Sequence, residues 1–342
     1  MIRVGYDEAV RTMQRALQGL LDEGPAREMA EIFAGNSMDG IHSHGMNRFP
    51  RFVHDLQSGI SDRTVLEARR VGALGAFEVW DGDFGVGPLI ARQMARRAAE
   101  LAGEHGIGCC ALRNNSHWLR AGRYALEMAD RGFIGLCATN TCMNLAAYGA
   151  LEPSTGNNPF AIALPGPEGS LLLDMAVSQI AYGKLEILAQ QGQKLDGCYG
   201  VDRKGEPTDD PREILEGGLL LPMAQWKGNA LSMMIDLVVA SASDGRTSRQ
   251  IGASAVRERG VSQIFVAIDN RRALDADHID ASIRQTMDFL QQVRRAPGSP
   301  EMHLPGQHLQ KIRETHQKEG IPVTQETWDR IVRLSEGGTL DD

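Results

Sequence analysis

The chain has 342 residues, of which 42% are hydrophobic and 23% are charged, and its formal net charge is −8. This composition is that of a globular protein, and the acidic balance argues against nucleic acid or an anionic membrane as a general partner. No apolar run approaches the ~20 residues of a membrane span, and the first residues lack the pattern of a secretory signal. The five cysteines form no CxxC pair, so we expect reduced thiols and a cytoplasmic protein.

Both ends of the chain are predicted to be helical. Over residues 1 to about 60, apolar side chains first recur at three- and four-residue spacing from Val10 to Leu20. A second helix is expected to begin at Pro25, because proline suits a first helical turn, and to stop before Gly35. Near the C-terminus, helices are predicted over residues 283–293, 307–318 and 326–334.

The centre of the chain mixes strands and helices. Strands are predicted over residues 76–80, 107–112, 134–138, 160–164, 171–175 and 263–269. Helices are predicted over residues 88–104, 121–131, 180–190 and 231–242, the last of them as a buried helix. Residues 139–159 and 191–217 are expected to be irregular. Taken alone, this alternation suggests a parallel, doubly wound sheet.

The segment SHGMNRFPRF, residues 43–52, concentrates side chains that suit an acid site. His44 can carry a proton near neutral pH, and Arg48 can hold a carboxylate through two parallel hydrogen bonds. If the segment is helical, these two side chains lie one turn apart on one face. The pattern predicts a site that holds an organic acid at one end and moves a proton at the other.

A glycine-rich loop, GVGPLI at residues 85–90, stands between a predicted strand and a predicted helix. It resembles a dinucleotide fingerprint but has Ile90 where the third glycine belongs. The simpler interpretation is a tight turn into a helix, so a standard Rossmann cofactor site is not supported.

Three polar segments follow predicted strands or precede them. His117, in RNNSHW, stands where a strand ends, a common place for ligand-binding residues, although Ser116 could simply cap the next helix. Asn158, in GNNP, offers an amide to a pocket or merely forms a turn. Asp174 closes an apolar strand, either as a helix cap or as a ligand for sugar hydroxyls.

Two further segments suit an anion. Lys227 lies between Trp226 and Gly228, ahead of a predicted helix, where a lysine can bind phosphate or carboxylate and an aromatic ring can stack. The turn at residues 303–307 precedes another helix, whose N-terminal N–H groups could receive a negative charge.

Metal-dependent chemistry is the main alternative. His42 and His44 form an HxH pair that could bind a metal in a hydrolase or isomerase. The chain has no HExxH motif and no Cys–His cluster, so we expect no metal. It also lacks the GxSxG motif of many serine hydrolases.

Together, these segments resemble the type-2 malate/L-lactate dehydrogenase family. The resemblance extends over about residues 2–334, and although each motif is weak alone, their order and spacing are specific. The motifs are SHG with Arg48, then NxxH at residues 114–117, GxNP at residues 156–159, DMA at residues 174–176 and WKG at residues 226–228. The resemblance implies reduction of a 2-keto acid to a 2-hydroxy acid with NADH or NADPH.

The family resemblance also implies a fold. It is an α/β fold with a non-Rossmann nicotinamide-binding domain on a mixed, largely antiparallel sheet, plus a helical domain from both chain termini. We therefore expect a helical domain of residues 1–70 and 275–342, a sheet domain of residues 71–274, and a homodimer. This expectation replaces the parallel sheet suggested by the alternation of elements.

Residue roles are carried over from the same resemblance. His44 is the expected proton donor, with His117 as the second candidate. The substrate would be bound by Arg48, which clamps its carboxylate, with Ser43 and Asn158. The residues expected to bind NAD, with NADH preferred and NADP possible, are Ser170, Leu171, Leu172, Leu173, Asp174, Met175, Ala176, Ser178, Trp226, Lys227, Gly228, Pro305, Gly306 and Gln307.

Three points stay open from the sequence alone. Asn157 departs from the family, whose members usually have Thr there, so the contacts near that turn are in doubt. Family members act on malate, lactate, ureidoglycolate and other acids, so the sequence leaves the substrate undecided. A catalytically inactive binding protein on the same scaffold is a further alternative.

Overall fold

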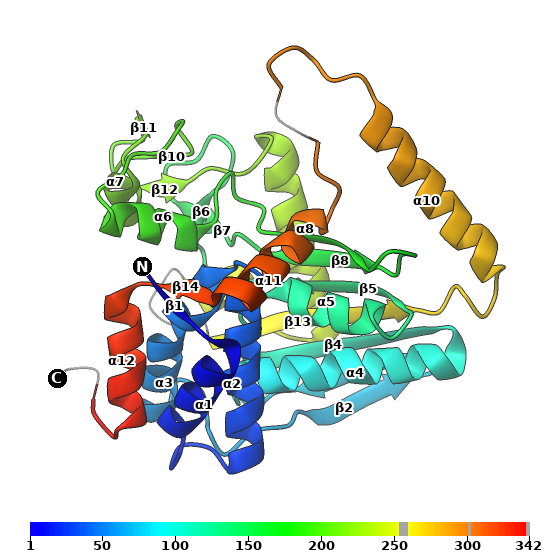
Figure 1. The fold of residues 1–342 in the computed structure, drawn as a ribbon, viewed down its shortest axis with the longest axis horizontal. Helices are drawn as coiled ribbons and strands as arrows, with labels where there is room; N and C mark the ends of the chain where they lie inside the picture. The colour runs from blue at the N-terminus through cyan, green and yellow to red at the C-terminus, as the bar shows by residue number, and fades with distance from the viewer. Residues whose placement is uncertain (253–258, 300–301, 340–342) are drawn as a thin grey trace.

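The computed structural model describes residues 1–252, 259–299 and 302–339 (Figure 1). Its largest sheet has seven strands in the order β2-β3-β4-β13-β5-β8-β9. Only β3 and β4 run parallel, and every other neighbouring pair is antiparallel. The strands are β2 (Arg69–Leu74), β3 (Phe77–Asp81), β4 (Ile107–Ser116), β13 (Arg259–Ile268), β5 (Ile134–Thr139), β8 (Phe160–Leu164) and β9 (Leu171–Met175). The mixed, mainly antiparallel sheet expected from the resemblance is confirmed, and the parallel alternative is wrong.

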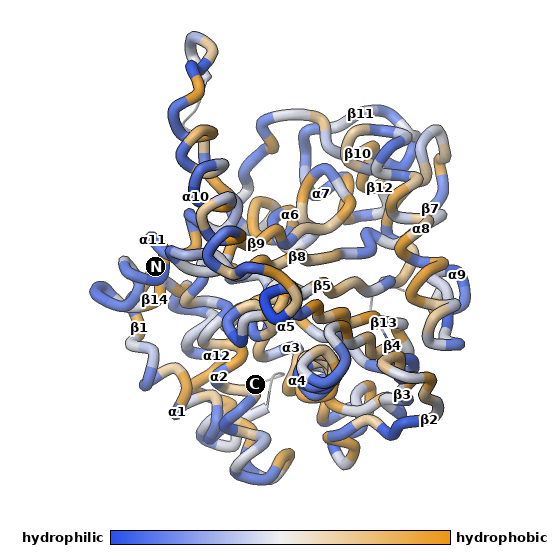
Figure 2. Tube along the Cα trace, turned by 90° about the vertical axis from the view of Figure 1, so that its right-hand side faces the viewer, coloured by the Kyte–Doolittle hydropathy of each residue, from blue (hydrophilic) through white to orange (hydrophobic). Residues whose placement is uncertain are grey.

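Helices cover this sheet on two sides. In Figure 2, α4 (Gly87–His105) and α5 (Ala121–Ala129) lie on one side of the sheet and α8 (Trp226–Ser243) lies on the other. Small residues let the layers approach closely, since a Cβ on Gly108 of β4 would stand 2.1 Å from the Ala98 carbonyl oxygen of α4. The core beneath α5 is aromatic, with the rings of Trp118, Tyr124 and Phe265 in mutual contact.

The two ends of the chain pack together (Figure 1). Strand β1 (Ile2–Val4) pairs antiparallel with β14 (Ile321–Val323), which the sequence analysis did not predict. Around this pair, buried apolar side chains from both ends form one cluster. The helices here are α1 (Tyr6–Ala16), α2 (Glu23–Met38), α3 (Phe49–Gln57), α11 (Gln307–Glu319) and α12 (Gln325–Ser335).

Helix α2 does not stop before Gly35 as predicted. It continues for four more residues, to Met38. Gly35 is buried against the Arg123 guanidinium, and a Cβ at this position would stand 2.7 Å from Nη1 of that arginine. The glycine therefore provides room for a neighbouring side chain and does not end the helix.

The stretches expected to be irregular contain only short elements. They contribute to a five-stranded sheet in the order β11-β10-β12-β6-β7, packed on α6 (Tyr182–Gln190) around Leu145, Leu185 and Leu220. The elements within these stretches are β6 (Leu145–Ala146), β7 (Pro153–Thr155), β10 (Gly200–Val201), β11 (Pro207–Thr208) and the short helix α7 (Pro211–Leu215). Strand β12 (Leu219–Leu220) follows directly, and a second short helix, α9 (Ser248–Ile251), lies further along the chain.

Two helices expose apolar side chains. Helix α10 (Ala276–Gln292) projects from the body (Figures 1 and 2) and has no buried residue. The prediction that residues 231–242 form a buried helix is wrong for one face of α8, where Met234 and Leu237 are 56% and 52% exposed. The inner face is covered by the sheet, and the outer face is uncovered in the single chain.

Candidate active site

The segment that carries His44 is held by the end of α2. It forms two single turns of 3₁₀ helix, η1 (His42–His44) and η2 (Met46–Arg48), so the continuous helix considered from the sequence is absent. Asn36 Nδ2 donates to the His44 carbonyl at 2.9 Å, and the Met46 N–H donates to Ser37 Oγ at 2.8 Å. A Cβ on Gly45 would stand only 2.0 Å from Ser37 Oγ, so glycine allows this close contact.

The two predicted catalytic histidines lie against each other. Their rings stack nearly parallel, with centroids 5.7 Å apart and an interplanar angle of 8°. The Ser43 hydroxyl lies 3.0 Å from Nδ1 of His44, within hydrogen-bond distance. The structure thus brings together His44 and His117, which are 73 residues apart in the sequence.

His117 is fixed in one neutral tautomer. The Leu119 N–H donates to its Nδ1 at 3.1 Å, so a neutral ring must carry its proton on Nε2. Leu119 adopts the left-handed region with φ of +71°, which aims that N–H back at the ring. Gly87 allows α4 to begin beside this turn, since its Cβ would stand 2.6 Å from the His117 carbonyl oxygen.

Both imidazoles are neutral at pH 7. Burial is the main cause that lowers the pKa of His44 to about 3, with further lowering by the positive charges of Arg48 and Arg120. Burial also lowers the pKa of His117, with Arg48 as the next cause and His44 and Arg51 contributing. Arg48 therefore acts on both rings, and an anion bound at this arginine would favour protonation of a histidine.

A buried ion cluster adjoins the histidines, and the sequence analysis missed it. Arg120 Nη1 lies 2.6 Å from an Asp39 oxygen, and Arg120 Nε lies 2.6 Å from an Asp174 oxygen. Arg313 of α11 also pairs with Asp39. A signal was present, because Arg120 interrupts the otherwise apolar run WLRAG directly after His117.

The three segments predicted to bind the cofactor adjoin β9. At its start, the Leu172 N–H donates to the Pro305 carbonyl at 3.4 Å, and Gly306 packs so closely that its Cβ would stand 3.0 Å from Leu172 N. Beyond its end, the Met223 N–H donates to the Val177 carbonyl at 2.9 Å, which places the first turn of α8 there.

The start of α8 has an unusual backbone. Ala224 and Gln225 both have positive φ, 47° and 57°, directly before the helix. Trp226 is 60% exposed at the first helical position, and Lys227 Nζ lies 5.9 Å from the centre of its ring. The Lys227 ammonium is the group in this turn that suits an anion, because the backbone N–H groups of Lys227 and Gly228 already donate to the Ala224 and Met223 carbonyls.

Asn158 is fully buried and its amide is already bonded. Its Nδ2 donates to the Ser232 carbonyl and hydroxyl, each at 2.9 Å, and its Oδ1 accepts from the Thr141 N–H at 3.0 Å. The neighbouring Asn157 accepts from the Val177 N–H through its carbonyl. The turn at residues 157–158 therefore connects the segment after β9 to α8. Substrate binding by Asn158 stays a prediction.

The HxH pair divides between two neighbours. His42 faces His316 of α11, with ring centroids 6.0 Å apart, whereas His44 faces His117. Among the residues that the structure describes, no group of three or more His, Cys, Asp or Glu side chains is arranged to hold a metal ion. Likewise, none of the described helices combines the length and apolar character needed to cross a bilayer.

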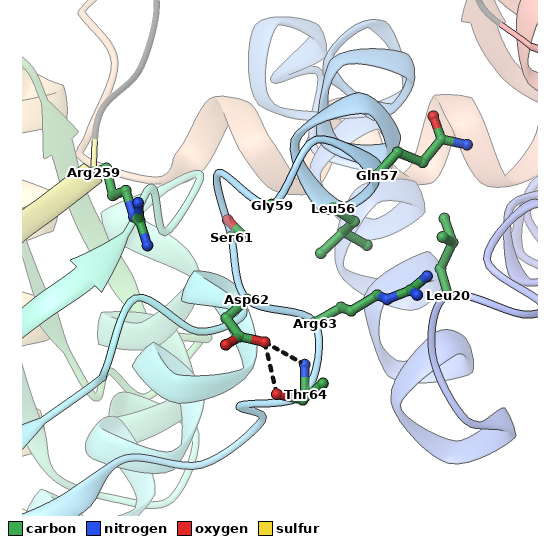
Figure 3. A pocket seen from close by; sticks show the side chains of 9 residues that line it. All are labelled: Leu20, Leu56, Gln57, Gly59, Ser61, Asp62, Arg63, Thr64 and Arg259. Atoms are coloured by element: carbon green, nitrogen blue, oxygen red, sulfur yellow. Dashed lines mark hydrogen bonds between the residues drawn. The ribbon is translucent and has the colours of Figure 1, made fainter.

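Two surface cavities lie near the terminal helices. One, of about 420 Å³, lies between Leu20 and Arg259 and contains the Asp62–Thr64 turn (Figure 3). It includes none of the predicted site residues. The other, of about 860 Å³, is bordered by Arg313 and Asp39 of the ion cluster.

Comparison with known proteins decides the family. A sequence model described as malate/L-lactate dehydrogenase matches residues 4–332. The chain belongs to the malate/L-lactate dehydrogenase family. It is therefore an oxidoreductase of the kind that acts on hydroxy acids and keto acids.

Individual relatives cover nearly all of the chain. The 2,3-diketo-L-gulonate reductase of Salmonella paratyphi C is 36% identical over 97% of this chain and all of its own length. The malate dehydrogenase of Pyrococcus horikoshii has a similar structure, with a TM-score of 0.89 and 28% identity over 98% of this chain and 95% of that one. The Δ1-piperideine-2-carboxylate reductase of Pseudomonas syringae has a TM-score of 0.85 and 27% identity over 98% and 100% of the two chains.

Proposed function

We propose that this dehydrogenase reduces a 2-keto acid to the corresponding 2-hydroxy acid, with His44 as proton donor and Arg48 as carboxylate clamp. The observation that carries the proposal is the stacked pair of neutral, partly buried imidazoles under the positive charge of Arg48. Such a site favours an anion, and it has an ionisable group for the oxygen that becomes negatively charged.

The cofactor assignment is NAD, with NADH preferred and NADP possible. When bound, the reduced nicotinamide supplies the hydride that adds to C2 of the keto acid. The start of α8 fits such a group, because the Lys227 ammonium offers positive charge to phosphates beside the exposed Trp226 ring. Near the other end of β9, Asp174 pairs with Arg120, whose positive charge acts on His44.

His44 and Arg48 have separate tasks in this proposal. The Ser43 hydroxyl occupies Nδ1 of His44, which leaves Nε2 to donate to the C2 oxygen as negative charge develops. Arg48 holds the C1 carboxylate, and that negative charge offsets the arginine charges that keep His44 neutral in the free chain. His117, with its Nδ1 held by Leu119, presents Nε2–H as a donor near the same oxygen.

The proposed substrate is 2,3-diketo-L-gulonate, reduced to 3-dehydro-L-gulonate, because the 2,3-diketo-L-gulonate reductases of two Salmonella strains are 36% identical over 97% of this chain. Malate, lactate or ureidoglycolate chemistry is the alternative within the family. The decisive test measures NADH and NADPH oxidation with 2,3-diketo-L-gulonate beside pyruvate and oxaloacetate. We expect the highest kcat/KM with diketogulonate and NADH, and equal or higher values with pyruvate or oxaloacetate would favour the alternative.

We further propose a homodimer. The outer face of α8 exposes Met233, Met234, Leu237 and Val238, and the projecting α10 exposes Phe289. Apolar side chains gathered on a helix face are usually covered by a partner, and a second copy of this chain is the partner that we infer. We also propose a cytoplasmic enzyme, because its five cysteines are unpaired. Its proposed helical part comprises residues 1–70 and 275–342, which contribute most of the terminal apolar cluster. The proposed sheet part comprises residues 71–274, without a Rossmann fold.

A further inference from the structure

Arg120 joins three distant segments of the chain. It lies in the connection between β4 and α5, and it is only 4% exposed. One nitrogen reaches Asp39, the residue that caps the C-terminus of α2, and another reaches Asp174 in β9. Both distances are 2.6 Å, which is short for a charge-assisted N–H···O bond.

The bridge is built into the surrounding packing. Gly122 leaves the space that the Asp174 carboxylate occupies, because a Cβ there would stand 2.4 Å from its Oδ2. Arg313 pairs with the other oxygen of Asp39, so two arginines and two aspartates balance in charge. Charges buried in this way are costly unless they stay paired, so the cluster strongly favours one geometry.

The two carboxylates belong to the two halves of the site. Asp39 continues the helix end whose Asn36 and Ser37 hold the His44 segment by hydrogen bonds. Asp174 belongs to the strand along which the cofactor segments gather. The guanidinium of Arg120 therefore connects the end of α2, which holds the His44 segment, to β9, beside which the proposed cofactor segments lie.

We propose that Arg120 is a positioning residue for the reduction: it fixes the His44 segment relative to β9 and provides a permanent positive charge beside that histidine. This inference rests on the proposed function, because it assigns Arg120 a task in keto-acid reduction. An error of about 1 Å in such an alignment can cost roughly a hundredfold in rate.

The electrostatic part of the proposal has a definite sign. The charged and titratable groups around His44 are Arg48 from η2, and His117 and Arg120 from the β4–α5 connection. From α6, Tyr182 lies within electrostatic range of Arg51 and Arg48. Arg120 lowers the pKa of His44. Replacing Arg120 by a neutral residue leaves two aspartates with one arginine, so the pKa of His44 must rise.

The test compares Arg120→Gln and Arg120→Lys with Arg92→Gln. Arg92 is a matched control, because it also joins two carboxylates from different helices, Glu28 and Glu127, but does not act on His44. The His44 pKa is measured by NMR on 13C-histidine-labelled full-length protein, with the signal assigned from a His44→Gln variant. Steady-state rates and thermal midpoints are measured alongside.

We expect Arg120→Gln to raise the pKa of His44 by roughly one pH unit and to lower kcat/KM by about tenfold to a hundredfold. Arg120→Lys should leave the pKa of His44 within a few tenths of a unit of the wild-type value, because the positive charge remains. It should still lower kcat/KM, because lysine cannot bridge both carboxylates. Arg92→Gln should lower only the thermal midpoint. An unchanged pKa and rate in Arg120→Gln would overturn the inference. An inactive wild-type chain would instead refute the proposed function, whereas the NMR result would still be readable.

Discussion

The rings of His44 and His117 stack at 5.7 Å with an angle of 8° between their planes. Two imidazolium rings would repel each other at this distance, so at most one of the two histidines is positively charged at a time. Ser43 contacts one ring through Nδ1, and Leu119 contacts the other through Nδ1. In both rings Nδ1 is occupied, so Nε2 is the nitrogen that the proposed function assigns to the substrate oxygen.

The carboxylate clamp can be tested at Arg48. Arg48→Lys should raise KM for keto acids by about tenfold and change kcat less, because lysine keeps the charge but cannot form the bidentate pair. The matched measurement uses the methyl ester of the same keto acid, which has no carboxylate to clamp. If the acid and the ester respond alike, the clamp is elsewhere.

Substrate binding should be coupled to proton uptake. His44 is neutral in the free chain because its pKa lies at about 3, whereas a proton donor must be protonated before it reacts. The substrate carboxylate beside Arg48 should raise that pKa and draw a proton from solvent. Calorimetry with NADH and a non-reducible carboxylate such as oxamate, in two buffers of different ionisation enthalpy, should detect uptake of a fraction of a proton. His44→Gln should abolish it, and identical heats in both buffers would contradict the coupling.

The low pKa of His44 also predicts an acid-labile fold. The pKa of His44 is about 3 in the folded chain and near 6.5 when unfolded. Between these pH values the unfolded chain binds more protons than the folded chain, so the free energy of unfolding falls as the pH falls from 6.5 toward 3. Above pH 6.5 this histidine causes no loss of stability. Between pH 7 and pH 5, His44 should lower the free energy of unfolding by about 2 kcal/mol.

Denaturant unfolding at the two pH values measures that loss. His44→Gln should reduce it, while His54→Gln, at an exposed position of α3, should leave it unchanged. Equal pH dependence in the wild type and in His44→Gln would show that this histidine is not held neutral by the fold.

Much of the chain's local structure could be predicted from sequence. The helix predicted over residues 88–104 is α4, which begins one residue earlier, and the strands predicted over residues 160–164 and 171–175 are β8 and β9. The strand order could not be predicted, because β13 inserts between β4 and β5 only through pairing across more than a hundred residues. Residues 1–4 gave no strand signal, because β1 exists only through its partner β14.

The candidate site shows the same division. His44, His117 and Arg48 were identified because their residue types are informative and their motifs resemble a family. Arg120 was missed because its partners lie 81 and 54 residues away, and a lone arginine in an apolar run has no local signature of pairing. Asn158 was singled out as an amide donor, but its burial and bonding depend on the distant α8.

The exposed face of α8 predicts how the dimer can be broken. Leu237→Glu puts a charge in the centre of that face and should shift the chain toward monomer, because an unpaired charge in an interface is costly. Leu74→Glu is the control, since Leu74 is 83% exposed at the end of β2. Light scattering during size-exclusion chromatography gives the masses. A wild-type mass of one chain, or a Leu237→Glu dimer as stable as the control, would rule out this face.

The division of labour between the two histidines is tested most directly by replacing each one. Single-turnover oxidation of bound NADH should be measured for the wild type, His44→Ala and His117→Ala with the preferred keto acid, together with NADH affinity from fluorescence titration. The account predicts a loss of about a hundredfold to ten-thousandfold in rate for His44→Ala, a smaller loss for His117→Ala, and near-normal NADH affinity in both. A near-normal rate in His44→Ala, with the larger loss in His117→Ala, would contradict the central role of His44.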